Sequence, residues 1–205
     1  MLQQTVTDEG GSMFRQTTDR RVAAFFADGL EECEALVVCD CLFRSGIPVD
    51  KVSITDRRAV TSSHEVTVVC DRSITDDDFS FGDYDMLFLP GGMPGTTNLG
   101  ECTALMGAVR EQVVAGRDLA AVCAAPSLLA RLGLLEGRHA TSNPDFQQML
   151  TDHGATVLQD PVVIDGNLIT SKGLGTCVEL GLALVRRILS DEAAETLKDQ
   201  IVYLR

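Results

Sequence analysis

A chain of 205 residues is long enough for one well-buried domain and too short for two ordinary ones. The formal net charge of −13 argues against nucleic acid or an anionic membrane as a partner, because phosphate groups bind basic surfaces. Seven scattered cysteines, without a CxxC or Cys/His cluster, argue against a zinc site and a disulfide framework and predict a reducing, cytoplasmic setting.

The predicted elements alternate between strand and helix. Residues 1–20 are polar and without periodicity, which predicts a disordered or tag-like tail before one domain over residues 21–205. No secretory signal and no membrane-spanning run is visible. Strands are expected at Val22–Phe26, Val49–Ile54, Val66–Cys70, Tyr84–Leu89, Leu119–Val122, Ala140–Ser142, Val162–Ile164 and Leu168–Thr170. Helices are expected at Glu31–Arg44, Cys102–Ala115, after Cys123, at Pro144–Asp152, at Thr176–Leu189 and from Asp191. This alternation predicts a largely parallel sheet with helices on both faces.

Cys123 lies at a predicted corner between a strand and a helix. Leu119–Val122 is typical of a short buried strand, and the following residues predict a helix with Pro126 in its first turn. Such a corner directs a side chain at the helix N-terminus, where free N–H groups favour an anion. We therefore expect a thiol that titrates low and reacts as a thiolate. The alternative is a small core residue, the usual place of an unpaired cysteine.

Four stretches follow predicted strands and should meet beyond the same edge of the sheet. They are Asp28–Glu34, Pro90–Gly95, Cys123 with Ala124, and Ser142–Pro144. Glu34 stands beside apolar residues, so its carboxyl either faces the thiol as a proton carrier or is another acid of the first helical turn. Gly91 and Gly92 either turn backbone N–H groups toward an oxyanion or form an ordinary turn.

Histidine is the expected base for a cysteine nucleophile. The chain has three histidines, His64, His139 and His153, and no motif marks any of them as a catalytic partner.

Five motifs, in this order and at these separations, resemble the DJ-1/ThiJ/PfpI superfamily on its DJ-1 side. They are FADGLEECEAL, FLPGGMPGTTNL, LAAVCAAPSLLA, SNP and ITSKGLGTCVELGLALV, and the resemblance covers about Val22 to Leu189. It implies a flavodoxin-like three-layer α/β sandwich, a homodimer, and chemistry without a cofactor.

The resemblance also implies roles for particular residues. Cys123 matches the family's nucleophile-elbow cysteine and Glu34 its acidic partner, while Gly92 and Ala124 match the donors of backbone N–H groups to an oxyanion. The site-lining positions are Gly91, Asn143, Pro144, Lys172, Gly173 and Leu174. Outside the site, Arg44 matches an arginine on the first helix and Cys70 a cysteine near the family's dimer contact.

Three departures from the family pattern qualify the resemblance. Asn143 stands where human-type members have a histidine before the proline, and several bacterial members also lack that histidine. The amide of Asn143 cannot act as a base at neutral pH. Lys172 and Leu174 stand where the family usually carries Arg and Pro. Ala124 follows the cysteine where PfpI-type proteases have histidine, which argues against a protease and against an amidotransferase.

Two functions fit these residues. The first is a glyoxalase III or deglycase-like enzyme, a lyase or hydrolase, in which the Cys123 thiolate adds to a small aldehyde and Glu34 moves a proton between the substrate carbons. The second is a redox-sensing or chaperone-type stress protein, in which Cys123 is oxidised and hydrogen-bonded by Glu34. Both functions use the same two residues, so the sequence does not choose between them.

Overall fold

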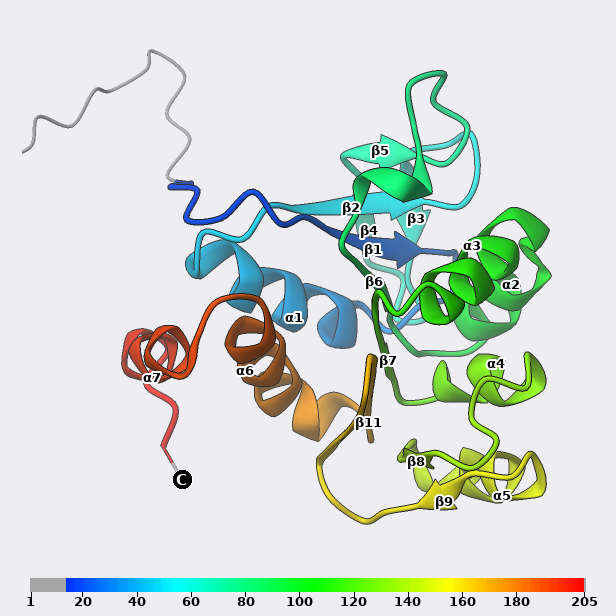
Figure 1. The fold of residues 1–205 in the computed structure, drawn as a ribbon. Coiled ribbons are helices and arrows are strands. Elements are labelled where there is room, and N and C mark those ends of the chain that lie inside the picture. The colour runs from blue at the N-terminus through cyan, green and yellow to red at the C-terminus, as the bar shows by residue number, and fades with distance from the viewer. Residues whose placement is uncertain (1–13, 205) are drawn as a thin grey trace, which may run out of the picture.

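The computed structural model describes residues 14–204 and shows a central sheet between two layers of helices (Figure 1). The seven-stranded sheet has the order β10-β11-β7-β6-β1-β2-β5, and only the β10–β11 pair is antiparallel. Its strands are β1 (Val22–Phe26), β2 (Val49–Ser53), β5 (Arg72–Ser73), β6 (Met86–Leu89), β7 (Asp118–Val122), β10 (Val162–Asp165) and β11 (Leu168–Ser171). The predicted α/β class and mostly parallel sheet are confirmed.

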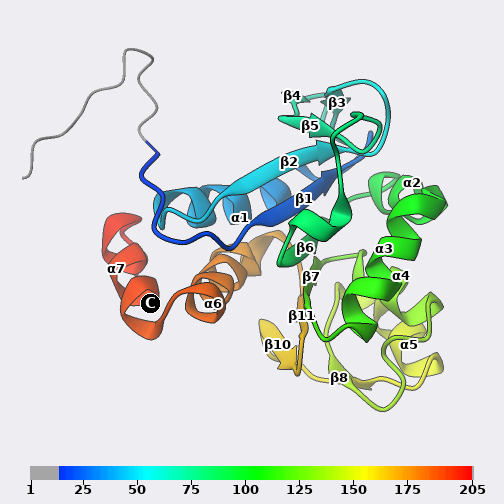
Figure 2. The same cartoon turned by 45° about the horizontal axis from the view of Figure 1, so that its top comes forward.

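Two groups of helices cover the two faces of this sheet (Figure 2). One group is α1 (Glu32–Arg44), α6 (Cys177–Ile188) and α7 (Asp191–Gln200). The other is α2 (Gly95–Glu101), α3 (Thr103–Val114), α4 (Pro126–Arg131) and α5 (Pro144–Asp152). Short 3-10 turns, η1 (Phe81–Asp83) and η2 (Leu174–Thr176), precede β6 and α6. No helix within residues 14–204 has both the length and the apolar character that crossing a bilayer requires.

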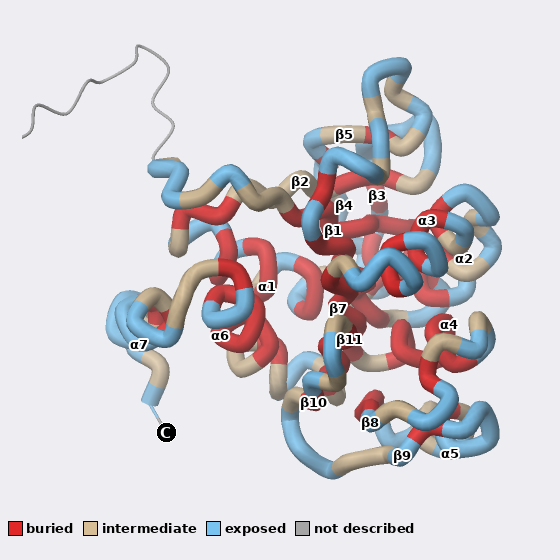
Figure 3. The backbone as a smooth tube through the Cα atoms, in the orientation of Figure 1, coloured by how far each residue is buried: buried red, intermediate tan, exposed pale blue. Residues whose placement is uncertain are grey.

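The central strand β1 shows why both layers are needed. Its five residues, VAAFF, are all buried. Because side chains alternate across a strand, Phe26 enters the core beneath α1 and α6, and Phe25 enters the core on the opposite face. Figure 3 shows the same burial, with red backbone concentrated in the strands and on the inner sides of the helices. Two hydrophobic cores therefore hold the ends of the parallel strands in fixed positions.

Several predicted elements have other partners or bounds in the structure. The predicted strand Val66–Cys70 is β4 (Thr67–Val69), and it pairs with β3 (Ala59–Thr61) in a separate antiparallel hairpin. The predicted strand Ala140–Ser142 is reduced to β8 (His139–Ala140), which pairs only with β9 (Thr156–Val157). Helix α2 and the edge strand β5 were not predicted, because neither short segment carries a periodic apolar pattern of its own.

The prediction of a disordered or tag-like tail is wrong for residues 14–20. Residues 1–13 lie outside the described residues. From residue 14 the chain lies against the body of the protein, where the Thr17 N–H donates to the Gly46 carbonyl at 2.9 Å and the Phe14 ring lies 4.8 Å from the Phe43 ring. Arg20 forms an ion pair of 3.2 Å with Asp118 at the start of β7. These contacts are long-range, so the polar composition of the segment did not reveal them.

Candidate active site

Four loops that follow neighbouring parallel strands build the candidate site. In the order β11-β7-β6-β1, the strands are followed by Lys172–Thr176, by Cys123, by Pro90–Gly95 and by the turn into α1. Parallel strands end at the same edge, so these loops converge although they are far apart in the sequence. Of the four stretches predicted to converge, Asp28–Glu34, Pro90–Gly95 and Cys123 with Ala124 meet at this edge of the main sheet. The fourth, Ser142–Pro144, follows β8 outside the main sheet, but it reaches Cys123 through the Asn143 N–H.

Cys123 occupies a strained backbone corner between β7 and α4. Its φ angle is 63°, in the left-handed region that non-glycine residues seldom adopt. The Cys123 N–H donates to the Ser171 carbonyl at 3.0 Å, and the Cys123 carbonyl accepts from the Asn143 N–H at 2.9 Å. These two hydrogen bonds fix the corner on both sides. Cys123 packs against the core beneath α1 and α6 but keeps intermediate exposure, so it is only partly a core residue.

Glu34 lies in the first turn of α1, with its carboxyl turned inward. The residue is only 2% exposed, and its carboxyl lies beside Cys123, since a methyl group at Gly91 would lie 2.5 Å from both Cβ of Cys123 and Oε2 of Glu34. Glu31 is the N-cap of the same helix and accepts the Glu34 N–H at 2.5 Å, which orients this turn. Glu34 is therefore more than a solvated first-turn acid, and its carboxyl lies beside the thiol as the resemblance implied.

Burial raises the pKa of the Glu34 carboxyl to about 6. The hydrogen bond with Cys123 and the backbone N–H groups of Gly91 and Leu174 oppose this rise because they stabilise the carboxylate, while the negative charge of Glu31 adds to it. The Oε2 atom of Glu34 is buried without a hydrogen-bond partner among the described residues. A buried carboxyl with this pKa can both give and take a proton near neutral pH.

The expectation that the Cys123 thiol titrates low is wrong while Glu34 is ionised. Burial, followed by the charge and hydrogen bond of Glu34, raises the pKa of the thiol to about 12. The backbone N–H groups of Gly92 and Ala124 act in the opposite direction, as expected at a helix N-terminus, but they are the smaller effect. Near neutral pH the negative charge of the pair therefore resides on the Glu34 carboxylate, and a thiolate forms when the thiol proton moves to Glu34.

Glycines allow the thiol and the carboxyl to approach one another. A methyl group at Gly91 would lie 2.5 Å from Cβ of Cys123 and 2.5 Å from Oε2 of Glu34. Gly92 has a φ angle of 90°, and a methyl group there would lie 2.1 Å from the Glu31 nitrogen. Because both positions exclude a side chain, the backbone N–H groups of this loop can face the site.

The remaining predicted site residues contribute unequally. A methyl group at Gly173 would lie 3.5 Å from Oε1 of Glu34 and 4.0 Å from Sγ of Cys123, so this glycine borders both groups. Lys172 differs, because its ammonium donates to the carbonyl and side-chain oxygens of Gln159, at 2.6 and 3.0 Å. The Lys172 ammonium is therefore bound to Gln159 and does not contact the Cys123 thiol.

Asn143 and Pro144 begin helix α5 beside the cysteine corner. The Asn143 Oδ1 accepts the Asp145 N–H at 3.1 Å, which caps the helix, and Pro144 takes its first position. The Asn143 Nδ2 lies 4.0 Å from a methyl group placed at Gly173. Asn143 is thus a helix cap that also borders the site.

The histidines lie outside the thiol and carboxyl pair. His64 projects from the β3–β4 hairpin to the start of α1, where its Nδ1 lies 3.1 Å from Glu32 and 3.9 Å from Glu31. These three residues form a group that could hold a metal ion, with ligand atoms within 4.8 Å of one another. His139 pairs with Asp165 at 3.1 Å, and His153 bonds to the Met149 carbonyl at 2.8 Å. Sequence reasoning missed the position of His64, because only the hairpin brings it to α1.

Comparison with known proteins identifies the family. The DJ-1/PfpI family profile matches residues 20–187 of the chain. The chain belongs to the DJ-1/PfpI family. It is 36% identical over 170 residues to protein DJ-1 homolog A of Arabidopsis thaliana, which covers 82% of this chain but 43% of that protein. The chain therefore spans less than half of this plant relative.

Relatives of similar length also match this DJ-1/PfpI chain. Protein dj-1beta of Drosophila melanogaster is 34% identical, over 82% of this chain and 89% of its own. The glutathione-independent glyoxalase DJ-1 of Schizosaccharomyces pombe is 30% identical, over 84% of this chain and 93% of its own.

Solved structures confirm the DJ-1 flavodoxin-like fold. A DJ-1 superfamily protein of Salmonella typhimurium superposes with a TM-score of 0.83 at 32% identity, covering 91% of this chain and 100% of that one. Drosophila DJ-1beta superposes with a TM-score of 0.83 at 31% identity, covering 92% and 100%.

Proposed function

We propose that this protein is a cofactor-independent cysteine enzyme acting on small reactive aldehydes such as methylglyoxal, in the manner of glyoxalase III or a deglycase. The observation that carries the proposal is the adjacent Cys123–Glu34 pair, in which one buried carboxyl of pKa about 6 adjoins one partly accessible thiol. A relative named as a glutathione-independent glyoxalase supports the substrate class.

The first step is addition of the thiol to the aldehyde. As the proton moves from sulfur to Glu34, the thiolate attacks the aldehyde carbon and a carbon–sulfur bond forms. The negative charge develops on the former carbonyl oxygen, where the N–H groups of Gly92 and Ala124 serve as donors. Glu34 then supplies the proton to that oxygen, and a neutral hemithioacetal results.

The second step moves a proton between the two substrate carbons. The Glu34 carboxylate removes the proton from the carbon bound to sulfur and returns it to the adjacent carbonyl carbon, while the electrons rearrange through an enediol. The product is a thioester of Cys123, and water hydrolyses it to a hydroxy acid and the free thiol. Atoms balance, because methylglyoxal plus water equals lactic acid.

The proposal is tested by measuring D-lactate formed from methylglyoxal without glutathione. Cys123→Ala removes the nucleophile and Glu34→Gln the proton carrier, so we expect at least a ~100-fold loss of turnover in each. Cys102→Ser is the matched control, because Cys102 lies at the N-cap of α3, away from the site, and should keep full turnover. Turnover that survives in Cys123→Ala would overturn the proposal.

A redox sensor is the second candidate function. Among the seven cysteines, Cys39, Cys41, Cys70 and Cys177 are buried, whereas Cys123 combines partial exposure with a neighbouring acid. Oxidation to the sulfinic acid would place an oxygen where protonated Glu34 can donate a hydrogen bond. If the protein lacks turnover but gains the mass of two oxygens at Cys123 under mild peroxide, the sensor replaces the enzyme as the conclusion.

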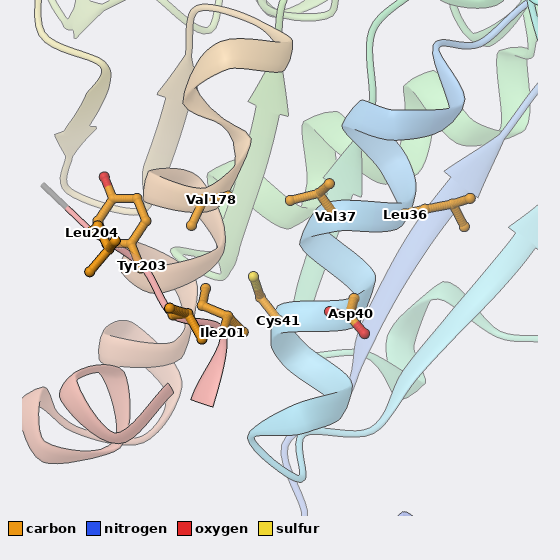
Figure 4. A pocket seen from close by; sticks show the side chains of 9 residues that line it. Leu36, Val37, Asp40, Cys41, Val178, Ile201, Tyr203 and Leu204 are labelled. Carbon is orange, nitrogen blue, oxygen red and sulfur yellow. The ribbon is translucent and has the colours of Figure 1, made fainter. Parts of the chain in front are cut away.

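We further propose that the partner is a second copy of this chain, docked on the outer face of α1. Leu36 and Phe43 are exposed there by 36% and 45%. A hollow of about 630 Å³ lies between α1 and the C-terminal segment, and Leu36 contributes to its lining. Figure 4 shows Val37 and Cys41 of α1 pointing toward the C-terminal segment, whereas Leu36 projects from the other side of the helix. A second hollow on the other side of α1 also includes Leu36. Because the outer face of α1 forms a ridge between these two hollows, it can pack against α1 of a second copy of the chain.

Light scattering during size-exclusion chromatography tests this homodimer. Leu36→Glu places a charge at the centre of the proposed contact and should convert the dimer to a monomer. Val114→Glu is the matched control, because Val114 is 78% exposed on α3 and lies outside the contact. A monomeric mass for the unsubstituted protein would refute the dimer.

A further inference from the structure

Two glutamates at the start of α1 and a histidine of the β3–β4 hairpin form a group of metal-ligating side chains outside the Cys123–Glu34 pair. Nδ1 of His64 lies 3.1 Å from Oε2 of Glu32 and 3.9 Å from Oε1 of Glu31. Ligand atoms about 2.1 Å from a tetrahedral metal ion are about 3.4 Å apart. The two nitrogen–oxygen distances therefore lie on either side of the spacing that one bound ion requires.

Backbone hydrogen bonds hold the hairpin against the start of α1. The Ser63 N–H donates to the Leu30 carbonyl at 2.8 Å, and the Gly29 N–H donates to the Thr61 carbonyl at 2.8 Å. His64 directly follows Ser63, so the main chain keeps its imidazole beside the first turn of the helix. The nitrogen and oxygen ligands are thus brought together by the fold itself, and binding an ion requires little rearrangement.

The two carboxylates are largely buried and have no permanent positive partner. The Glu31 and Glu32 side chains are only 14% and 12% exposed. Within residues 14–204 their one ion-pair partner is His64, and an imidazole is positively charged only when it is protonated. Glu34 adds a third carboxyl to the same helical turn. Because neighbouring like charges that are withdrawn from water destabilise one another, a divalent cation between Glu31 and Glu32 would stabilise this turn.

We propose that Glu31, Glu32 and His64 bind one divalent transition-metal ion such as Zn²⁺, which joins the β3–β4 hairpin to α1. An imidazole ligand favours ions of this class over Mg²⁺ and Ca²⁺, which prefer oxygen ligands alone. Three protein ligands leave the fourth tetrahedral position to water. His64 lies 32 positions after Glu32, so no local ligand motif marks the site in the sequence. None of the three ligands belongs to the Cys123–Glu34 pair, and the inference does not depend on the proposed function.

Isothermal titration calorimetry with Zn²⁺ tests the site. All titrations use the Cys123→Ala background, so that the thiol of the candidate active site does not compete for the ion. We expect one ion per chain. His64→Ala and Glu32→Gln each remove one ligand, and each should weaken binding by at least about tenfold. His139→Ala is the matched control, because Nδ1 of His139 also lies 3.1 Å from a carboxylate but has Asp165 as its one acidic partner among the described residues. This variant should bind Zn²⁺ with unchanged affinity.

Cys33→Ser separates the proposed ligands from a neighbouring thiol. Cys33 is exposed and follows Glu32 directly in the chain, so its sulfur is the alternative ligand for Zn²⁺. Binding through the two carboxylates and the imidazole predicts full affinity in Cys33→Ser. Three results would overturn the proposal: no binding in the Cys123→Ala background, a loss of affinity in Cys33→Ser without a loss in His64→Ala, or equal losses in His64→Ala and His139→Ala.

Unfolding in urea with and without Zn²⁺ tests the connection between the two elements. An ion that joins the hairpin to α1 binds the folded chain and not the unfolded one, so saturating Zn²⁺ should raise the urea midpoint. His64 is exposed, so His64→Ala should keep nearly the same midpoint without Zn²⁺ and lose the rise that Zn²⁺ causes. A rise that persists in His64→Ala would show that the ion binds elsewhere. Neither measurement involves turnover, so the result is independent of whether methylglyoxal is a substrate.

Discussion

At the scale of single residues, Gly91 controls the distance between the thiol and the carboxyl. The methyl group of Gly91→Ala would lie 2.5 Å from Cys123 Cβ and 2.9 Å from the Val122 carbonyl, so the loop must move. Overpacking of this kind costs about 1–3 kcal/mol, and we expect turnover to fall with the displaced pair. Unfolding in urea and lactate formation measure the two effects.

Gly107→Ala is the control for that substitution. Gly107 lies in the exposed middle of α3, with no atom within 4 Å of an added methyl group. Alanine is a better helix residue than glycine, so this variant should be more stable by about 0.5–1 kcal/mol and keep its activity. Equal stability of the two alanine variants would show that the close approach at Gly91 is not constraining.

Glu34 makes the stability of the fold depend on pH. Its pKa rises from 4.5 to about 6 in the folded state, so the folded protein binds this proton more tightly than the unfolded chain. The resulting stabilisation of the folded state is fully present below pH 4.5 and is lost as the pH rises through about 6. The shift corresponds to about 2 kcal/mol.

Glu34→Gln removes this titration. The stability of the glutamine variant relative to the unsubstituted protein should increase by about 2 kcal/mol between about pH 4 and about pH 7. Urea unfolding across this range measures it, with Glu111→Gln, an exposed acid on α3, as the control. A constant difference between Glu34→Gln and the unsubstituted protein would contradict the raised pKa.

At the scale of elements, Asn143 contributes through helix α5. Its Oδ1 accepts the Asp145 N–H, and an N-cap of this type is worth about 1 kcal/mol. Asn143→Ala should therefore lower the free energy of unfolding by about 1 kcal/mol, while Asn143→Asp, which keeps the accepting oxygen, should change it little. Thermal unfolding compares the two variants, and equal losses would show that the cap is unimportant.

At the scale of the whole molecule, Asp118 joins three distant segments. It is 5% exposed at the start of β7, and it pairs with Arg187 at 2.8 Å and with Arg20 at 3.2 Å. Asp118→Asn leaves both guanidinium groups facing a neutral oxygen. Because both arginines keep 38% side-chain exposure, we expect a loss of about 2–3 kcal/mol, below the full cost of breaking a buried pair.

Asp191→Asn is the matched control for Asp118→Asn. Asp191 is 77% exposed and pairs with Arg186 on the surface. Such pairs contribute less than about 1 kcal/mol, so the urea midpoint should hardly change. Similar losses in both variants would show that the three segments do not depend on Asp118.

The candidate site was predictable from the sequence to the extent that its motifs are local. The corner at Cys123 follows from an apolar strand that runs into a helix with an early proline, and the inward turn of Glu34 follows from the family resemblance. The titration of Cys123 was not predictable in this way, since it depends on burial and on Glu34, which lies 89 positions away in the chain. The catalytic roles of both residues stay predictions.

The sequence by itself determined the alternation of strands and helices, because apolar periodicity is a property of neighbouring residues. It also determined the parallel sheet, since helices between strands require crossover connections. Only the tertiary structure decided that β4 pairs outside the main sheet, that residues 14–20 lie along the body, and that the Lys172 ammonium is bound by Gln159. Strand pairing, burial and charge depend on groups that folding brings together, and no short window of sequence contains them.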